Sequence, residues 1–190
     1  MTIHPWEQPP AGQAAVAVDR IAQALPRIAT DRTILRGPYM EDFNVFADLV
    51  TSDRGRYVSG PLTREGAWDD FIQLTASWIL RGCGLWTVEH QDDKRVLGFV
   101  LLGHETGDPE PELGFLFTAE AEGEGYAFEA SEKARNNAWN ALSFETLVSY
   151  IDPDNDRAIA LARRLGAEKI ENEVHDGCEV WRYARPEYDL

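Results

Sequence analysis

The alternation of hydrophobic and polar positions predicts a chain of short strands and amphipathic helices. Residues 32–36 alternate and end at Gly37, which is typical of a first strand. Two helices with apolar faces are expected next, followed by three strands whose short polar connections favour an antiparallel meander. These elements are the helices over residues 40–50 and 64–81, and the strands over residues 85–89, 95–105 and 111–117.

The second half of the chain alternates helices and strands. A helix over residues 125–142 carries alanines at spacings of three and four, which allow close packing against a sheet. Residues 146–151 are almost continuously apolar, as in a strand buried on both faces. A helix that follows Asn155 and a hairpin that turns at Asp176 complete the chain. The sequence therefore predicts a mixed α/β (α+β) sheet with a strand-helix-strand unit around residues 111–152.

Residues 1–28 differ from the rest of the chain. Prolines begin this segment and an alanine-rich stretch follows, so we expect an extended arm and a helix that packs on the domain or on a partner subunit. The division that we predict is an N-terminal arm and helix over residues 1–28 and a single domain over residues 29–190. The arm also makes a homodimer an expectation.

Composition limits the class of protein. A length of 190 residues favours one domain with a substantial core. No apolar run reaches the roughly 18 residues of a membrane span, and the N-terminus lacks the pattern of a signal peptide, so we expect a cytoplasmic protein. Cys83 and Cys178 match no zinc or redox spacing, so no metal site is predicted.

The net charge of −15 changes the expected partners. A field of this sign repels nucleic acids and anionic membranes, and it attracts cations such as amines. An anionic cofactor would have to be held mostly by backbone groups.

The candidate chemistry lies where the strand over residues 111–117 leads through Gly123 and Gly125 into a helix. Free amides at a helix start favour anions, and glycines allow close approach of a phosphate. The dinucleotide fingerprint fails because Phe128 stands at the third glycine position, and no P-loop lysine is present.

The segment Glu120–Gly125 resembles the coenzyme A motif Q/R-x-x-G-x-G/A of the GCN5-related N-acetyltransferase (GNAT) superfamily. The wider likeness is to the RimJ/RimL-like branch, which acetylates the N-termini of ribosomal proteins, and it extends over about residues 29–185. The segments that carry it are residues 29–36, 97–100, 112–115, 123–130, 152–155 and 165–166. The resemblance implies a mostly antiparallel sheet with a splayed centre and flanking helices.

The resemblance also implies roles for individual residues. Phe117 and Thr118 would pair with the pantetheine arm of the cofactor, and Asn155 would lie near its thiol, although Asn155 also reads as a helix cap. The amides that would hold the pyrophosphate are those of Gly123, Glu124, Gly125, Tyr126 and Ala127.

Several residues depart from the family pattern. Glu120 replaces the usual Gln or Arg. Glu122 and Glu124 repel phosphate modestly if they point outward, and they would weaken coenzyme A binding if they point inward. Ala158 and Ala162 stand where family members often carry a Ser or Tyr that protonates the leaving thiolate. Another residue or water must then supply that proton.

Candidate catalytic residues lie on the central strands. Glu112 would act as the base through a water, and its alternative is a structural ion pair or an exposed strand carboxylate. His104 and Glu105 end the preceding strand and are further candidates, or plain surface residues. Tyr150 would protonate the thiolate, or else be a core aromatic.

The function that we predict is transfer of an acetyl group from acetyl-CoA to a primary amine by direct attack in a ternary complex. The acceptor would be an amine-bearing small molecule or a protein N-terminus. Two alternatives are a non-catalytic acyl-CoA-binding or regulatory module on the same fold, and a nucleotide-binding α/β protein.

Overall fold

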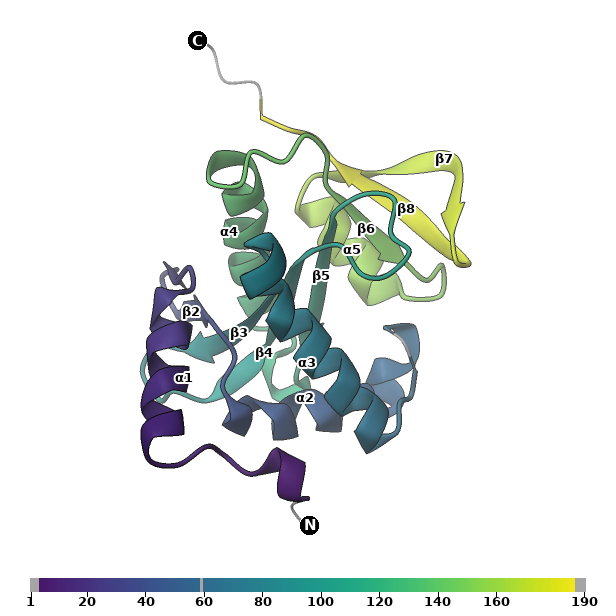
Figure 1. The fold of residues 1–190 in the computed structure, drawn as a ribbon. Helices are drawn as coiled ribbons and strands as arrows, with labels where there is room; N and C mark the ends of the chain where they lie inside the picture. Colours follow the sequence, from purple (N-terminus) through teal and green to yellow (C-terminus); the bar gives the residue numbers. More distant parts are fainter. Residues whose placement is uncertain (1–3, 59, 187–190) are drawn as a thin grey trace.

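The computed structural model describes residues 4–58 and 60–186, and its strands form one eight-stranded sheet in the order β1-β2-β3-β4-β5-β6-β8-β7 (Figure 1). Among the described residues, β5 and β6 pair in parallel, and all other neighbouring strands are antiparallel. The strands are β1 (Ile28–Ala29), β2 (Thr33–Arg36), β3 (Leu85–His90), β4 (Val96–Gly103), β5 (Glu112–Phe117), β6 (Val148–Ile151), β7 (Ala167–His175) and β8 (Cys178–Tyr183).

Helices cover both faces of the sheet (Figure 1). Successive residues of a strand point to opposite faces, so Val100 and Leu101 of β4 reach different parts of the core. Val100 packs in the larger cluster with α4, and Leu101 packs with α2 and α3. The helices are α1 (Gln13–Ala24), α2 (Phe43–Val50), α3 (Arg64–Arg81), α4 (Tyr126–Asn140) and α5 (Asp156–Arg164), with the 3-10 helices η1 (Pro5–Glu7), η2 (Met40–Asp42), η3 (Asp53–Tyr57) and η4 (Ala119–Ala121).

The structure confirms the mixed, mostly antiparallel sheet and the β5-α4-β6 unit. It adds the short strand β1 and the helix η3 within the polar connector that follows α2. Strand β4 ends two residues before the predicted boundary. The reason is local, because the Asp108 carboxylate accepts a hydrogen bond of 2.7 Å from the Glu105 amide and turns the chain. Across residues 4–58 and 60–186, no helix is both long and apolar enough to cross a bilayer.

Strands β5 and β6 separate soon after they meet. Their register contains the single pair Glu112–Val148, and Val148 N donates to Pro111 O at 3.0 Å. In a continued parallel ladder the Tyr150 amide would donate to Leu113 O. Instead, Leu113 O accepts from the hydroxyl of the buried Ser149 at 2.5 Å. The expected splayed centre is therefore present, and a side chain satisfies the carbonyl that the ladder leaves free.

A buried ionic network fixes the other half of the sheet. The Asp42 carboxylate accepts from Arg36 Nη1 at 2.7 Å, from Tyr39 N at 2.8 Å and from Thr87 Oγ1 at 2.8 Å. Arg36 Nε also donates to Glu89 Oε2 at 2.8 Å. These contacts join β2, η2 and β3, and Asp42 stands directly before α2. All three charges are paired and hydrogen-bonded, which offsets the cost of burying them.

We predict that Asp42→Ala lowers the free energy of unfolding by about 3 kcal/mol, because Arg36 then keeps a buried charge with fewer partners. Urea denaturation monitored by tryptophan fluorescence measures the change. Glu41→Ala, at the exposed neighbouring position, is the matched control and should change stability by less than about 0.5 kcal/mol. Equal effects of the two substitutions would contradict this account of the network.

Candidate active site

Two cavities meet where β5 and β6 part, with volumes of about 480 and 450 Å³. The first lies beside α4, α5 and the turn that precedes α4, and the second lies beside α2, α3 and the β7–β8 turn. Because these helices cover opposite faces, the cavities approach the gap from opposite sides of the sheet. The residues that line both are Tyr57, Val58, Glu112, Gly114, Phe115, Leu116 and Tyr150.

Backbone groups dominate one end of the first cavity. Gly123 and Gly125 have φ values of +76° and +83°, in the left-handed region that favours glycine. Gly125 begins α4 without a side-chain cap, and the first amides of a helix have no acceptor within it. Gly123, Gly125 and Ala127 line the cavity. This end of the cavity therefore suits an anion.

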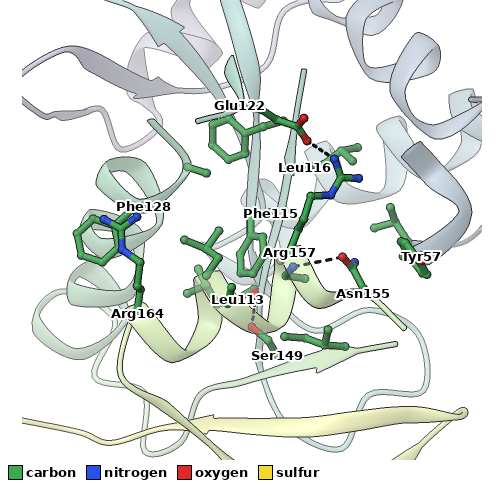
Figure 2. A pocket seen from close by; sticks show the side chains of 18 of the residues that line it. Tyr57, Leu113, Phe115, Leu116, Glu122, Phe128, Ser149, Asn155, Arg157 and Arg164 are labelled. Atoms are coloured by element: carbon green, nitrogen blue, oxygen red, sulfur yellow. Dashed lines mark hydrogen bonds and ion pairs between the residues drawn. The ribbon is translucent and has the colours of Figure 1, made fainter. Parts of the chain in front are cut away.

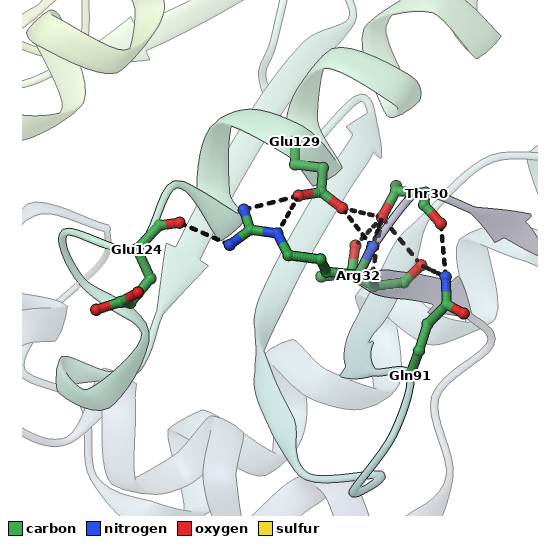
Figure 3. A network of polar contacts seen from close by, with 6 residues as sticks. Thr30, Arg32, Gln91, Glu124 and Glu129 are labelled. Atoms are coloured by element: carbon green, nitrogen blue, oxygen red, sulfur yellow. Dashed lines mark hydrogen bonds and ion pairs between the residues drawn. The ribbon is translucent and has the colours of Figure 1, made fainter.

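A polar network anchors this turn to the start of the sheet (Figure 3). Arg32 Nη1 donates to Glu124 O at 3.0 Å, and Arg32 Nε donates to Glu129 Oε2 at 2.8 Å. The Glu129 carboxylate also accepts from the Arg32 amide at 2.8 Å and from the Thr30 hydroxyl. Sequence reasoning missed this network, since 97 residues separate Arg32 from Glu129 and only the acidic first turn of the helix marks it.

The two carboxylates of the turn behave differently. Glu124 is exposed and lies outside both linings. Glu122 lines the first cavity, where its Oε1 is 2.5 Å from Arg54 Nη2 and also accepts from Arg157 (Figure 2). Arg54 further donates to Phe117 O at 3.0 Å. We call this set of contacts the Glu122 bridge, and it joins η3, the turn before α4, and α5.

Glu112 lies at the junction of the two cavities. Burial raises the pKa of its carboxyl to about 8, with further contributions from Glu105 and Asp108, against a long hydrogen bond of 3.5 Å from Tyr150 N. Within residues 4–58 and 60–186 it makes no ion pair. Glu110 provides the contrast: despite burial, hydrogen bonds from Thr146 and Arg182 lower its pKa. A carboxyl without a cation beside it is suited to accept a proton.

Carboxylates gather in the second cavity. Burial raises the pKa of Glu105 to about 7, and Asp108 and Asp70 add to the shift. His175, which sequence reasoning missed, places Nε2 3.4 Å from Asp108 Oδ1, and its ring lies 4.6 Å from that of Tyr150. His175 comes from the final hairpin, far from the motif in sequence, so no local pattern marks it.

The structure separates the other predicted residues. Phe117, Asn155 and Ala158 line the first cavity, and Asn155 Oδ1 also caps α5 by accepting from Ala158 N at 3.2 Å. The Tyr150 hydroxyl is held by the Glu110 backbone, donating to the carbonyl at 3.4 Å. Burial raises the pKa of this hydroxyl to about 12. The predicted residues that lie outside both linings are His104, Thr118, Glu124 and Tyr126.

We predict that the free energy of unfolding falls as pH rises from about 4.5 to about 8, because folded Glu112 retains a proton that the unfolded chain has lost. Glu112→Gln should make this slope shallower, as measured by urea denaturation at pH 5, 6, 7 and 8. Glu110→Gln is the opposing control. The pKa of Glu110 is lowered in the folded protein, so ionised Glu110 stabilises the fold above its unfolded pKa, and this contribution is lost as the pH falls. Identical slopes for the wild type and Glu112→Gln would contradict the raised pKa.

Comparisons with known proteins match both sequence and fold. The chain is 27% identical over 151 residues to an uncharacterized protein of Bacillus subtilis, YkkB, a match that covers 75% of this chain and 86% of that protein. It is 32% identical to an acetyltransferase from Agrobacterium tumefaciens, with a TM-score of 0.81 over 85% of this chain and 96% of the other. The fold also matches RimL, a ribosomal L7/L12 alpha-N-protein acetyltransferase in complex with coenzyme A, at 16% identity and a TM-score of 0.66, over 84% of this chain and 97% of the other.

The most direct finding concerns the domain as a whole. The family model described as the acetyltransferase (GNAT) domain matches residues 32–168, which include β2, both cavities' central strands and the glycine turn. That span is more than half of the chain, and the likeness to the Agrobacterium enzyme covers 85% of it. The chain therefore belongs to the GNAT acetyltransferase family.

Proposed function

We propose that this protein transfers an acetyl group from acetyl-CoA to a primary amine by direct attack within a ternary complex. The observation that carries the proposal is the meeting of two cavities, from opposite sides of the sheet, at Glu112. Each cavity would hold one reactant, and the gap between β5 and β6 would bring the reacting atoms together. The family supports acetyl-CoA as co-substrate, and its acceptors are amines.

The first cavity suits the cofactor. The glycine turn and the first amides of α4 would hold the pyrophosphate. On the edge of β5 that faces the gap, the carbonyls of Leu113 and Phe117 accept hydrogen bonds from side chains. Backbone groups of alternate residues in a strand point to the same edge, so the amide and carbonyl of Phe115 also face the gap. These groups of Phe115 would pair with the pantetheine arm. The bound thioester supplies the activated acetyl group.

Glu112 would accept the proton of the incoming ammonium group. The neutral amine nitrogen then attacks the thioester carbonyl carbon, the carbon–sulfur bond breaks, the nitrogen releases its second proton to water, and the thiolate takes a proton. The ionised form of Glu112 accepts the proton, and the raised pKa makes that form a stronger base than an ordinary carboxylate. Ala158 has no proton to give, Ala162 is fully buried, and the Tyr150 hydroxyl is engaged by Glu110. Water therefore protonates the thiolate in this proposal.

The second cavity favours an acceptor with positive charge. Its lining includes six acidic residues, whereas its basic members are Arg56 and His175, and His175 already faces Asp108. A small molecule that carries a cationic group besides the reacting amine would offset the burial of these carboxylates. A protein N-terminus is the alternative acceptor. A homodimer and a cytoplasmic location stay predictions.

Glu112→Gln should lower kcat/KM at least about 100-fold, because it removes the proton acceptor. Thiol release with a panel of amines, and mass spectrometry of the product, measure the reaction. The dissociation constant of coenzyme A, measured by calorimetry, should change less than about twofold. Glu168→Gln, on exposed β7, should leave activity unchanged.

Two outcomes would count against the proposal. Coenzyme A binding without turnover on any amine of the panel would support the alternative, a non-catalytic acyl-CoA-binding module, which the alanine at position 158 also favours. A wild-type protein that binds ATP and fails to bind coenzyme A would instead support a nucleotide-binding protein.

We predict that Gly125→Val abolishes coenzyme A binding, since a branched residue strains the backbone at a φ of +83° and so displaces the amides of the glycine turn. Gly177→Val is the matched control, because Gly177 has a φ of +85° in the β7–β8 turn, away from the glycine turn. Calorimetry on both folded variants, with circular dichroism as a check, distinguishes lost binding from lost structure. If Gly125→Val and Gly177→Val bound coenzyme A with equal affinity, the glycine turn would not be part of the cofactor site.

A further inference from the structure

The Glu122 bridge closes three segments around the first cavity. Arg54 belongs to η3, Glu122 directly precedes the glycine turn, and Arg157 lies in the first turn of α5. Both guanidinium groups converge on the same carboxylate oxygen, Oε1. Two arginines on one anionic oxygen are also the arrangement by which proteins bind a phosphate oxygen.

The bridge is accessible and therefore exchangeable. The side chains of Arg54, Glu122 and Arg157 are 25%, 41% and 63% exposed. Ion pairs with this exposure contribute little net stability, because water competes for each partner. Hydrogen bonds from Arg54 lower the pKa of Glu122, so its carboxyl stays ionised while it holds both arginines.

Charge at this cavity runs against the charge of the chain. The net charge is −15, yet Arg54, Arg157 and Arg164 all line the first cavity. Arg164 lies 4.3 Å above the Phe128 ring, and within the described residues it makes no ion pair (Figure 2). Concentrated positive charge in an acidic protein indicates a site for an anion.

We propose that Arg54 and Arg157 form a phosphate subsite for coenzyme A, and that Glu122 fills this subsite in the free protein. The inference rests on the proposed function, because it assigns the anion to the cofactor of that reaction. Cofactor binding then exchanges one anion for another: a phosphate group takes the two guanidinium groups, and the Glu122 carboxylate moves into water. Glu122 is an internal competitor, and it lowers the affinity that the arginines would otherwise give.

The test compares two neighbouring carboxylates. Glu122→Gln and Glu124→Gln each remove one negative charge from the same turn, but only Glu122 contacts the arginines. We expect Glu122→Gln to bind coenzyme A about 10-fold more tightly by calorimetry, a change of about 1.4 kcal/mol. Glu124→Gln keeps the backbone amide of that residue, and its exposed side chain lies outside both cavities, so its affinity should stay within about twofold of the wild type. Equal effects of the two substitutions would overturn the proposal. Weaker binding by Glu122→Gln would also overturn it, since Glu122 would then contribute to holding the bound cofactor.

A double-mutant cycle tests the exchange itself. In the wild type, Arg54→Gln should weaken coenzyme A binding about fivefold. The substitution removes a contact to the phosphate, but it also removes an ion pair with Glu122 that cofactor binding would otherwise have to break. In the Glu122→Gln background that offset is absent, so Arg54→Gln should weaken binding about 50-fold. Additive effects would overturn the proposal, even if Glu122→Gln alone binds more tightly.

Dephospho-coenzyme A identifies the phosphate. If Glu122→Gln also binds dephospho-coenzyme A more tightly than the wild type does, the subsite holds and its phosphate is the pyrophosphate. If the gain in affinity is seen with coenzyme A and is lost with dephospho-coenzyme A, the subsite holds and its phosphate is the 3′-phosphate. The two levels of the proposal also fail separately. A wild type that does not bind coenzyme A overturns the proposed function and the subsite together. A wild type that binds and acetylates, with Glu122→Gln equal to Glu124→Gln, overturns the subsite alone.

Discussion

The separation of β5 from β6 is the constraint on which the rest of the structure depends. Two parallel strands that stay paired would leave no opening in the sheet, and the cavities on its two faces would never meet. Opening the ladder frees backbone groups, and a buried free carbonyl is costly. The hydroxyl of Ser149 removes that cost at Leu113, and it also exchanges a hydrogen bond with the Tyr183 hydroxyl at 2.9 Å. Strand β8, which carries Tyr183, thereby helps to hold the gap open.

The same opening explains the unusual electrostatics of Glu112. Its carboxylate takes the amide of Tyr150 that a continuous ladder would have used, so the side chain is kept at the point of separation. Glu110, only two residues away, has a cation and a hydroxyl beside it and behaves as an ordinary structural carboxylate. The difference between these two acids therefore arises from what the fold places around them.

Much of the architecture was predictable because it depends on local patterns. The small-residue stripe of α4 and the polar turns of the meander specify their neighbours within a few residues. The glycine turn was also visible, since positive φ values demand glycine there. Arg54 and His175 could not be found in this way. Each reaches the site from a distant segment, and nothing in its local sequence distinguishes it from a surface residue.

Glu122 shows most clearly what the sequence could not predict about the site. The sequence left open whether its carboxylate points into the cavity or away from it, because the answer depends on two arginines 68 and 35 residues away. A carboxylate beside a phosphate site reads as unfavourable in isolation. With both arginines in place it becomes part of a balanced group of charges.

Tyr57 belongs to the walls of both cavities, and its hydroxyl donates to Asp154 O at 3.0 Å, just before α5. Because Tyr57 would contact the ligands of both cavities, the binding of one ligand can be coupled to the binding of the other. If filling one cavity shifts Tyr57, the affinity of the other changes, and thermodynamic reciprocity requires the two effects to be equal. The order in which the reactants bind would then follow from the position of one aromatic ring.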